Sequence, residues 1–123
     1  MSFTPSDDFD DTWINIVSEI DTSALGGSDV VYYAKKKGNL IIFSLYITGI
    51  TFNASTYLQK QLLKSTSLNK PANYTSLNVF NGNDNSPIVN AMMDSSGRLW
   101  FRSDTNISNK DYFISGCYYT NNP

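Results

Sequence analysis

The residues best suited to chemistry in this chain gather around the segment Arg98–Arg102, which reads RLWFR. Side chains alternate between the two faces of a β-strand, so Trp100 shares a face with Arg98 and Arg102, whereas Phe101 points the other way. An aromatic ring stacks on the apolar patch of a sugar ring, while arginine and the Asn and Asp residues of nearby turns hydrogen-bond to its hydroxyl groups. This pattern predicts a platform for a sugar or a phosphosugar. The alternative is that Trp100 is a core residue whose flanking arginines extend into water at its edge.

The composition argues against catalysis. The chain has no histidine and a single cysteine, Cys117. A Ser-His-Asp or Cys-His nucleophile system therefore cannot be assembled, and neither can an ordinary zinc site. A glycosidase needs only two carboxylates, but Asp84 and Asp94 lie in turn sequences, where Asp is expected to bond to the backbone. We expect no enzyme activity, no metal site and no cofactor.

The charge pattern limits the partners. The formal net charge is −2, and the only basic cluster, Lys35–Lys37, fits a hairpin turn in water. No basic stripe is present to neutralise phosphates, so we expect no nucleic-acid partner. No stretch of about 18 apolar residues occurs, so we expect no membrane insertion.

The fold is predicted to form around Val30–Ile47, VVYYAKKKGNLIIFSLYI, which is typical of two strands joined at Lys37-Gly38-Asn39. The second strand is apolar on both faces: one carries Ile41, Phe43, Leu45 and Ile47, and the other carries Leu40, Ile42 and Tyr46. One face can pack into the core of the domain. The other needs a second layer of this chain or a partner chain, and the small size of the domain favours the partner.

The other segments are mostly strand-like. Leu58 and Leu62 are four residues apart among good helix formers, so Thr51–Lys64 is compatible with one or two helical turns. Gly116 indicates a bulge or close packing, and Cys117 is expected to be a small buried hydrophobe. The further predicted strands are Thr12–Ile20, Tyr74–Phe80, Pro87–Met93, Arg98–Arg102 and Tyr112–Thr120, with Asp94–Gly97 closing a hairpin.

The pattern predicts one all-β domain in a chain of 123 residues. Residues 1–11 are expected to be a flexible acidic arm. Residues 12–123 are expected to form a single antiparallel β-sandwich or barrel-like jelly roll of about six to eight short strands.

Four stretches, taken in order, resemble the C-terminal head domain of phage baseplate receptor-binding proteins, most closely those of siphophages that infect lactococci and related Gram-positive bacteria. The stretches are YYAKKKGNLIIFSLYITGI, Asn69-Lys70-Pro71, PIVNAMMDSSGRLWF and ISGCYYT. The resemblance covers roughly Trp13 to Thr120. It rests on the order and spacing of motifs that are each weak alone.

The resemblance implies a homotrimeric, non-catalytic head in the virion, at the tail tip or baseplate, made in the host cytoplasm. Its implied partners are host cell-wall polysaccharide and other baseplate or tail proteins. The implied saccharide-binding residues are Asn90, Met92, Asp94, Trp100 and Arg102. The family often has a histidine and an aspartate where this chain has Asn90 and Met92. The alternative is a structural tail-fibre or baseplate component that trimerises or caps the tail tip without binding saccharide.

Overall fold

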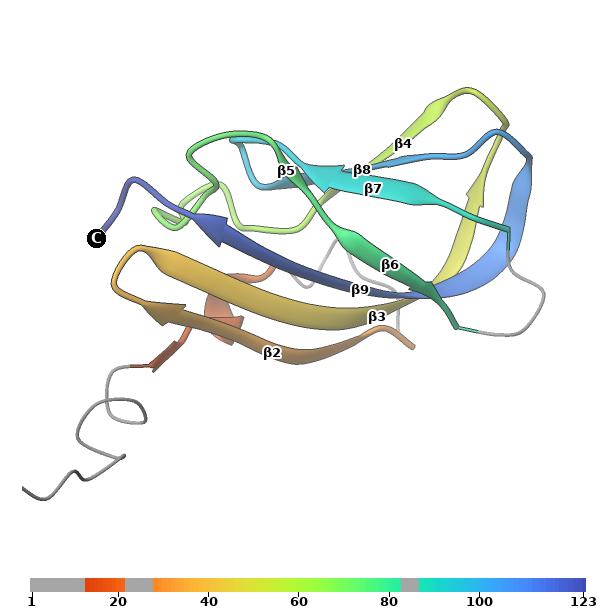
Figure 1. Ribbon diagram of the computed structural model, residues 1–123. Coiled ribbons are helices and arrows are strands. Elements are labelled where there is room, and N and C mark those ends of the chain that lie inside the picture. Colours follow the sequence, from red (N-terminus) through yellow and green to blue (C-terminus); the bar gives the residue numbers. More distant parts are fainter. Residues whose placement is uncertain (1–12, 22–27, 83–86) are drawn as a thin grey trace, which may run out of the picture.

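The strands of this protein form two antiparallel sheets that pack face to face, as the computed structural model shows (Figure 1). The structure describes residues 13–21, 28–82 and 87–123. The predicted all-β sandwich is confirmed. The predicted acidic arm, residues 1–11, lies outside the described residues.

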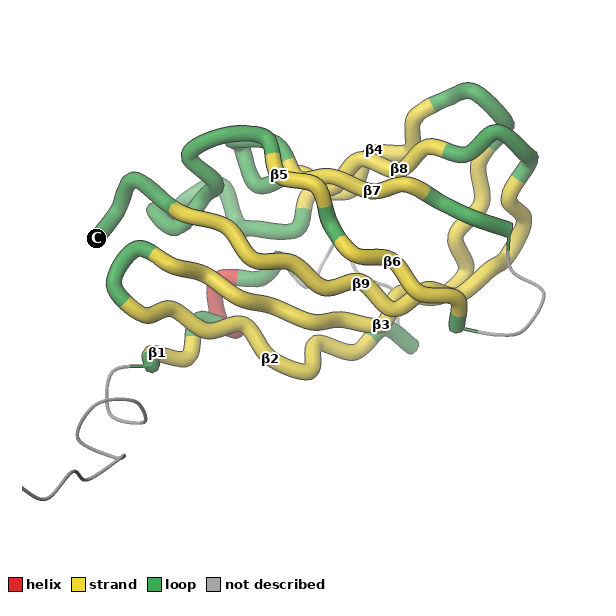
Figure 2. Tube along the Cα trace, viewed as in Figure 1, coloured by secondary structure: helices red, strands yellow, loops and turns green. Residues whose placement is uncertain are grey.

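The large sheet has the strand order β1-β2-β3-β9-β6, and the small sheet has the order β4-β8-β7-β5 (Figure 2). The strands of the large sheet are β1 (Ile14–Asn15), β2 (Val30–Lys37), β3 (Leu40–Phe52), β6 (Asn78–Asn81) and β9 (Ile107–Tyr119). Those of the small sheet are β4 (Tyr57–Gln61), β5 (Thr75–Ser76), β7 (Asn90–Met93) and β8 (Arg98–Arg102). The described residues thus contain nine strands, one more than the largest number expected, because Thr51–Lys64 contributes β4 and the predicted strand Tyr74–Phe80 is divided into β5 and β6.

The core lies between the two sheets. From the large sheet, the side chains of Phe43, Leu45 and Ile114 point inward and are almost fully buried. From the small sheet, Leu99 and Phe101 meet them and are also inaccessible to solvent. Each such side chain contributes about 1.5–3 kcal/mol through burial. Alternate side chains of β3 and β8 therefore point inward and form the core between the two sheets.

Both predicted hairpins are present. The turn Gly38-Asn39 joins β2 to β3, and Gly38 adopts a φ of 59°, which favours glycine. Asp94–Gly97 joins β7 to β8, and the amide of Gly97 donates to the Asp94 carbonyl oxygen at 3.0 Å.

The predicted strand Tyr74–Phe80 is split between the sheets. Thr75 and Ser76 pair with β7 in the small sheet, whereas Asn78–Asn81 pair with β9 in the large sheet. At the crossing point, the amide of Leu77 donates to the Ala91 carbonyl oxygen at 3.0 Å. The segment that the sequence predicts as one strand therefore contributes a short strand to each of the two sheets.

Two predictions of local structure are wrong. Of the predicted strand Thr12–Ile20, the described residues 13–20 form only the short β1 and a 3₁₀ turn, Val17–Glu19, and Ile16 and Ile20 are buried with a spacing of four residues. Thr51–Lys64 forms the end of β3 and all of β4 instead of helical turns. Pairing of β4 with β8 outweighs the helix propensity of Gln59–Gln61. Among the described residues, no helix is long and apolar enough to cross a membrane.

Strand β9 begins five residues before the predicted Tyr112. Cys117 is exposed rather than buried, because it pairs with Ile42 on the outer face of the large sheet. Gly116 provides close packing and no bulge, since the register is regular there. A Cβ atom on Gly116 would lie 2.6 Å from both Leu77 Cδ2 and Phe43 Cε1.

Replacing Gly116 with alanine is therefore expected to destabilise the protein by about 1–3 kcal/mol, since the added methyl group overpacks the core. Urea unfolding measures the change. Ser115→Ala, one residue away on the opposite face, is the control and should stay within about 0.5 kcal/mol of the wild type. Equal stability of the two variants would contradict the close packing.

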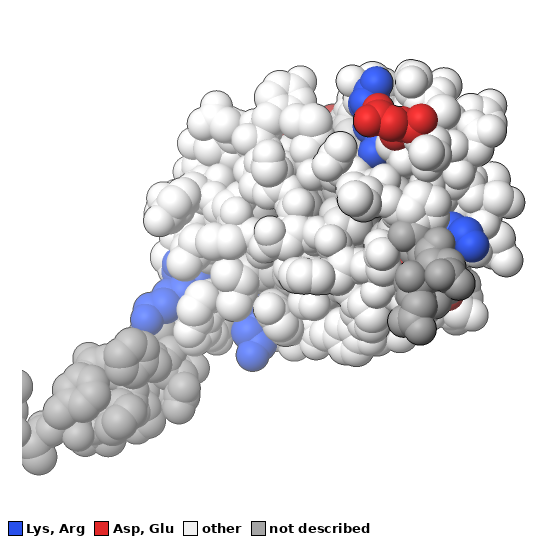
Figure 3. All heavy atoms as spheres, turned by 45° about the vertical axis from the view of Figure 1, so that its right-hand side comes forward, with Lys and Arg blue, Asp and Glu red and all other residues white. Residues whose placement is uncertain are grey.

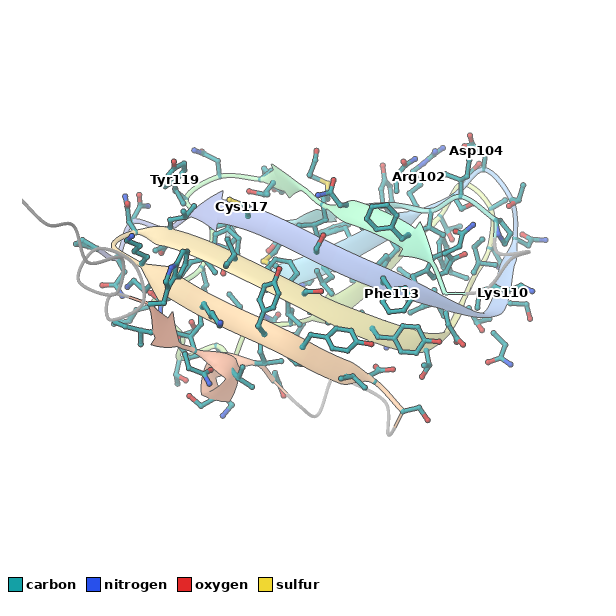
Figure 4. The ribbon with its side chains drawn as sticks, turned by 60° about the horizontal axis from the view of Figure 1, so that its bottom comes forward. Arg102, Asp104, Lys110, Phe113, Cys117 and Tyr119 are labelled. Carbon is teal, nitrogen blue, oxygen red and sulfur yellow. The ribbon has the colours of Figure 1, made fainter. Side chains whose placement is uncertain are left out.

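The outer face of the large sheet is apolar and accessible (Figure 4). Phe113 of β9 packs on Tyr46 with ring centroids 4.7 Å apart and stacks on Tyr32 at 6.3 Å. Tyr119 and Cys117 lie further along the same strand. Tyr32, Phe80, Phe113 and Tyr119 are all exposed. We name this surface, with Leu40 and Ile42, the apolar face.

Candidate functional site

The outer face of the small sheet brings the candidate residues together in two cross-strand rows. In one row, Trp100 of β8 lies between Gln59 of β4 and Met92 of β7. In the next row, Arg102 lies between Tyr57 and Asn90. Residues opposite one another in adjacent strands have Cβ atoms about 5 Å apart, so each row is a set of touching side chains. Trp100 is half-buried on this outer face, whereas Phe101 is in the core.

These rows surround a hollow of about 250 Å³. Four of the sequence-predicted residues line it: Asn90, Met92, Trp100 and Arg102. Tyr57, Ser76 and Ala91 complete the lining. We name this hollow the tryptophan hollow. Its walls combine aromatic surface with amide, hydroxyl and guanidinium groups.

Asp94, the fifth predicted residue, lies outside the lining and fixes the tryptophan instead. The indole Nε1–H of Trp100 donates to Asp94 Oδ2 at 2.7 Å. The other carboxylate oxygen accepts from the Ser96 hydroxyl at 2.6 Å and from the amides of Ser96 and Arg98 at 2.9 and 3.1 Å. Asp94 is only 8% exposed. It therefore closes the β7–β8 turn and sets the orientation of the indole ring.

The electrostatics of Asp94 follow from these bonds. Burial alone would raise the pKa of its carboxyl group, but the hydrogen bonds from Ser96, Trp100 and Arg98 outweigh burial and lower the pKa from 3.8 to about 2. The carboxylate stays ionised at any pH near neutrality.

Lowering the pH from about 5 to about 2 is expected to remove up to about 2 kcal/mol of stability through Asp94. A carboxyl group with a depressed folded-state pKa contributes its full stabilisation above the unfolded value of 3.8 and loses it as the pH falls through about 2. Urea midpoints across this range measure the effect. The Asp94→Asn variant lacks the titrating group, so its stability should fall less; identical pH profiles would contradict the assignment.

Tyr57 and Ser76 were missed by the sequence analysis. The ring of Tyr57 contacts Trp100 edge-on, with centroids 5.6 Å apart and an interplanar angle of 79°. Tyr57 is 58% exposed although it is a large aromatic residue. The assignment of possible helical turns to Thr51–Lys64 hid it, whereas reading Tyr57, Gln59 and Gln61 as alternate residues of a strand would have placed these three side chains on one face of a sheet.

The arginine side chains beside the tryptophan hollow already have partners. Arg102 Nη1 lies 3.0 Å from Asp104 Oδ1, and both side chains are seen at one end of the molecule in Figure 4. Arg98 Nη1 donates to Gln59 Oε1 at 3.0 Å. Figure 3 shows a surface on which charged side chains form only small, separate patches. The site is thus polar without carrying a strong net charge.

A second polar cluster has a structural role. The buried ammonium group of Lys36 donates to Asn69 Oδ1 at 2.7 Å, and Asn69 Nδ2 donates to both carboxylate oxygens of Glu19 at 2.9 Å. Ser67 adds a further hydrogen bond to Glu19 at 2.6 Å. These groups bond to one another, so they join β2 to two loops and leave little capacity for a ligand.

Within residues 13–21, 28–82 and 87–123, no group of three or more His, Cys, Asp or Glu side chains is placed to hold a metal ion. The residues that line the tryptophan hollow offer stacking and hydrogen bonding. In comparisons with known proteins, no protein-family model and no curated protein sequence matches this chain.

Proposed function

We propose that this protein is a non-catalytic receptor-binding head of a phage tail tip or baseplate, and that it binds cell-wall saccharide of a Gram-positive bacterium. One observation carries the proposal. Asn90, Met92, Trp100 and Arg102, which the resemblance to phage receptor-binding heads implies for saccharide binding, line one hollow, and Asp94 holds the indole ring of Trp100.

The geometry suits a sugar ring. The exposed surface of Trp100 and the ring of Tyr57 provide apolar contact with the C–H groups of the sugar. Asn90 and Ser76 provide donors and acceptors for hydroxyl groups beside that contact. Because Asp94 already holds the indole N–H, the ring is oriented before the ligand arrives, which lowers the entropic cost of binding.

The proposal includes a homotrimer that buries the apolar face. Exposed aromatic patches rimmed by polar residues are typical of protein–protein contacts. The apolar face and the tryptophan hollow belong to the outer faces of different sheets, so a trimer formed through the part of the apolar face on β2, β3 and β9 leaves both the tryptophan hollow and the edge strand β6 free. Three sites on one assembly raise avidity without new contacts. Light scattering should give a mass of three chains of 13.8 kDa each.

A structural tail component, which trimerises or caps a fibre without binding saccharide, is the second candidate. The apolar face favours it, since Tyr32, Phe80 and Tyr119 are exposed in a single chain. Such a component also uses neighbouring baseplate or tail proteins as partners. A trimer alone does not separate the two candidates, because both require one.

Binding of the labelled protein to intact Gram-positive cells, with purified cell-wall polysaccharide as competitor, tests the proposal. Saturable binding that the polysaccharide displaces is the expected result. Absence of binding across a broad panel of hosts would overturn the receptor-binding role and favour the structural component.

A further inference from the structure

The tryptophan hollow shares lining residues with two neighbouring hollows. The second, of about 570 Å³, is lined by residues of two segments, 76–80 and 88–91. It shares Ser76, Asn90 and Ala91 with the tryptophan hollow. The third, of about 420 Å³, is lined by Pro87, Ile88, Asn90, Ser103, Asp104 and Thr105. Asn90 borders all three, so the hollows adjoin one another around this residue, and we name the three together the groove.

The groove exists because of the way the chain changes sheets. β5 pairs only with Met92 and Met93 of β7. Beyond the bond from Leu77 to Ala91, the chain turns away to join β9 as β6. The first half of β7 is left without a neighbouring strand on that side, which opens the second hollow beside it.

The volumes indicate a ligand longer than one sugar unit. Sites for drug-sized ligands occupy about 300–1,000 Å³. At about 250 Å³, the tryptophan hollow falls below that range, whereas the neighbouring hollow alone falls within it. A ligand confined to the tryptophan hollow would therefore leave most of the groove empty. Ile88, which borders both neighbouring hollows, is 80% exposed and is placed to contact the next unit of a chain.

The charge of the groove points to an uncharged ligand. Of the residues that line the three hollows, only Arg102 and Asp104 carry a formal charge, and they pair with each other at 3.0 Å. The remaining polar lining consists of Ser, Thr, Asn and Tyr side chains. A phosphate group would need Arg102 to leave Asp104 and would place its own negative charge next to that carboxylate.

From these observations we infer that the tryptophan hollow is one subsite of an open groove that binds several consecutive units of an uncharged stretch of glycan. The inference rests on the proposed saccharide-binding function. The polymer crosses Asn90, with one unit on Trp100 and following units beside Ile88.

Calorimetric titration with cell-wall polysaccharide from a strain to which the protein adheres, and with size-graded fragments of it, tests the groove. Affinity should rise at least about tenfold from the single-unit fragment to fragments of several units. Ile88→Ala should weaken the longer fragments about fivefold and leave the single-unit fragment unchanged. Leu68→Ala is the matched control, because Leu68 is 75% exposed and lies outside the groove lining. Equal affinity for all lengths would overturn the groove, whereas failure of the intact polysaccharide to bind would overturn the proposed function itself.

Salt and phosphate test the charge of the ligand. Raising the ionic strength from about 0.1 M to about 1 M shortens the Debye length from about 10 Å to about 3 Å. The affinity should change less than about twofold over this range, and inorganic phosphate should not compete. A loss of about tenfold or more, or displacement by inorganic phosphate, would overturn the uncharged ligand and assign Arg102 to a phosphate group.

Discussion

Replacing Trp100 with alanine is expected to lower the affinity for cell-wall saccharide by about 100-fold or more, while the sandwich stays folded. The indole ring supplies the largest apolar surface of the tryptophan hollow, and its loss also frees Tyr57 from its edge-on contact. The core is not affected, because the inward residues on either side of Trp100 are Leu99 and Phe101. Calorimetric titration with the polysaccharide measures the affinity, and thermal unfolding checks the fold.

Trp13→Ala is the matched control for this prediction. Trp13 is the only other tryptophan of the chain, and it lies near Lys37, whose Nζ is 5.9 Å from the ring centroid. It contributes nothing to the tryptophan hollow, so its variant should bind like the wild type. If Trp100→Ala binds equally well, the platform is elsewhere. If it unfolds, Trp100 acts as a core residue.

Replacing Asp94 with alanine is expected to cost about 3 kcal/mol of stability, the largest effect among single changes in the β7–β8 turn. The change removes the acceptor for four donors: the hydroxyl and amide of Ser96, the amide of Arg98 and the indole N–H of Trp100. Donors that lose their only partner in a half-buried turn keep much of their desolvation cost. Saccharide binding should weaken as well, because the indole ring loses its fixed orientation.

Urea unfolding compares Asp94→Ala with two variants. Asp94→Asn keeps one carbonyl oxygen and should lie between the wild type and the alanine variant. Asp104→Ala is the matched control: its ion pair with Arg102 is surface-exposed, with 88% of the Asp104 side chain accessible, so it should cost less than about 1 kcal/mol. Equal losses for Asp94→Ala and Asp104→Ala would contradict the structural role of Asp94.

The sequence predicted the hairpin that carries the candidate site. Gly97 and Asp94 mark the β7–β8 turn, and alternation on either side of it places Asn90, Met92, Trp100 and Arg102 on one face. Only this short-range pairing was needed to bring these residues together. Along β3, the same alternation separated Phe43 and Leu45 from the opposite face, and the structure shows that theirs is the inward one.

The long-range part could not be predicted. Tyr57 meets Trp100 only because β4 pairs with β8, some forty residues further along the chain, and nothing near Tyr57 specifies that partner. Ser76 reaches the hollow because the chain changes sheets at Leu77, in the middle of a pattern that resembles one strand. The exposure of Cys117 depends on the register of β9 against β3. In each case the position of the side chain depends on which strand pairs with which, and the local sequence does not specify that pairing.

The measurement that tests the central claim most directly is the fluorescence of Trp100 during titration with purified cell-wall polysaccharide. The chain has two tryptophans, so a Trp13→Phe variant reports from Trp100 alone. We predict a saturable change in its emission, with a midpoint equal to the dissociation constant from calorimetry. Binding of the polysaccharide without any change in Trp100 emission would contradict a saccharide site on the outer face of the small sheet.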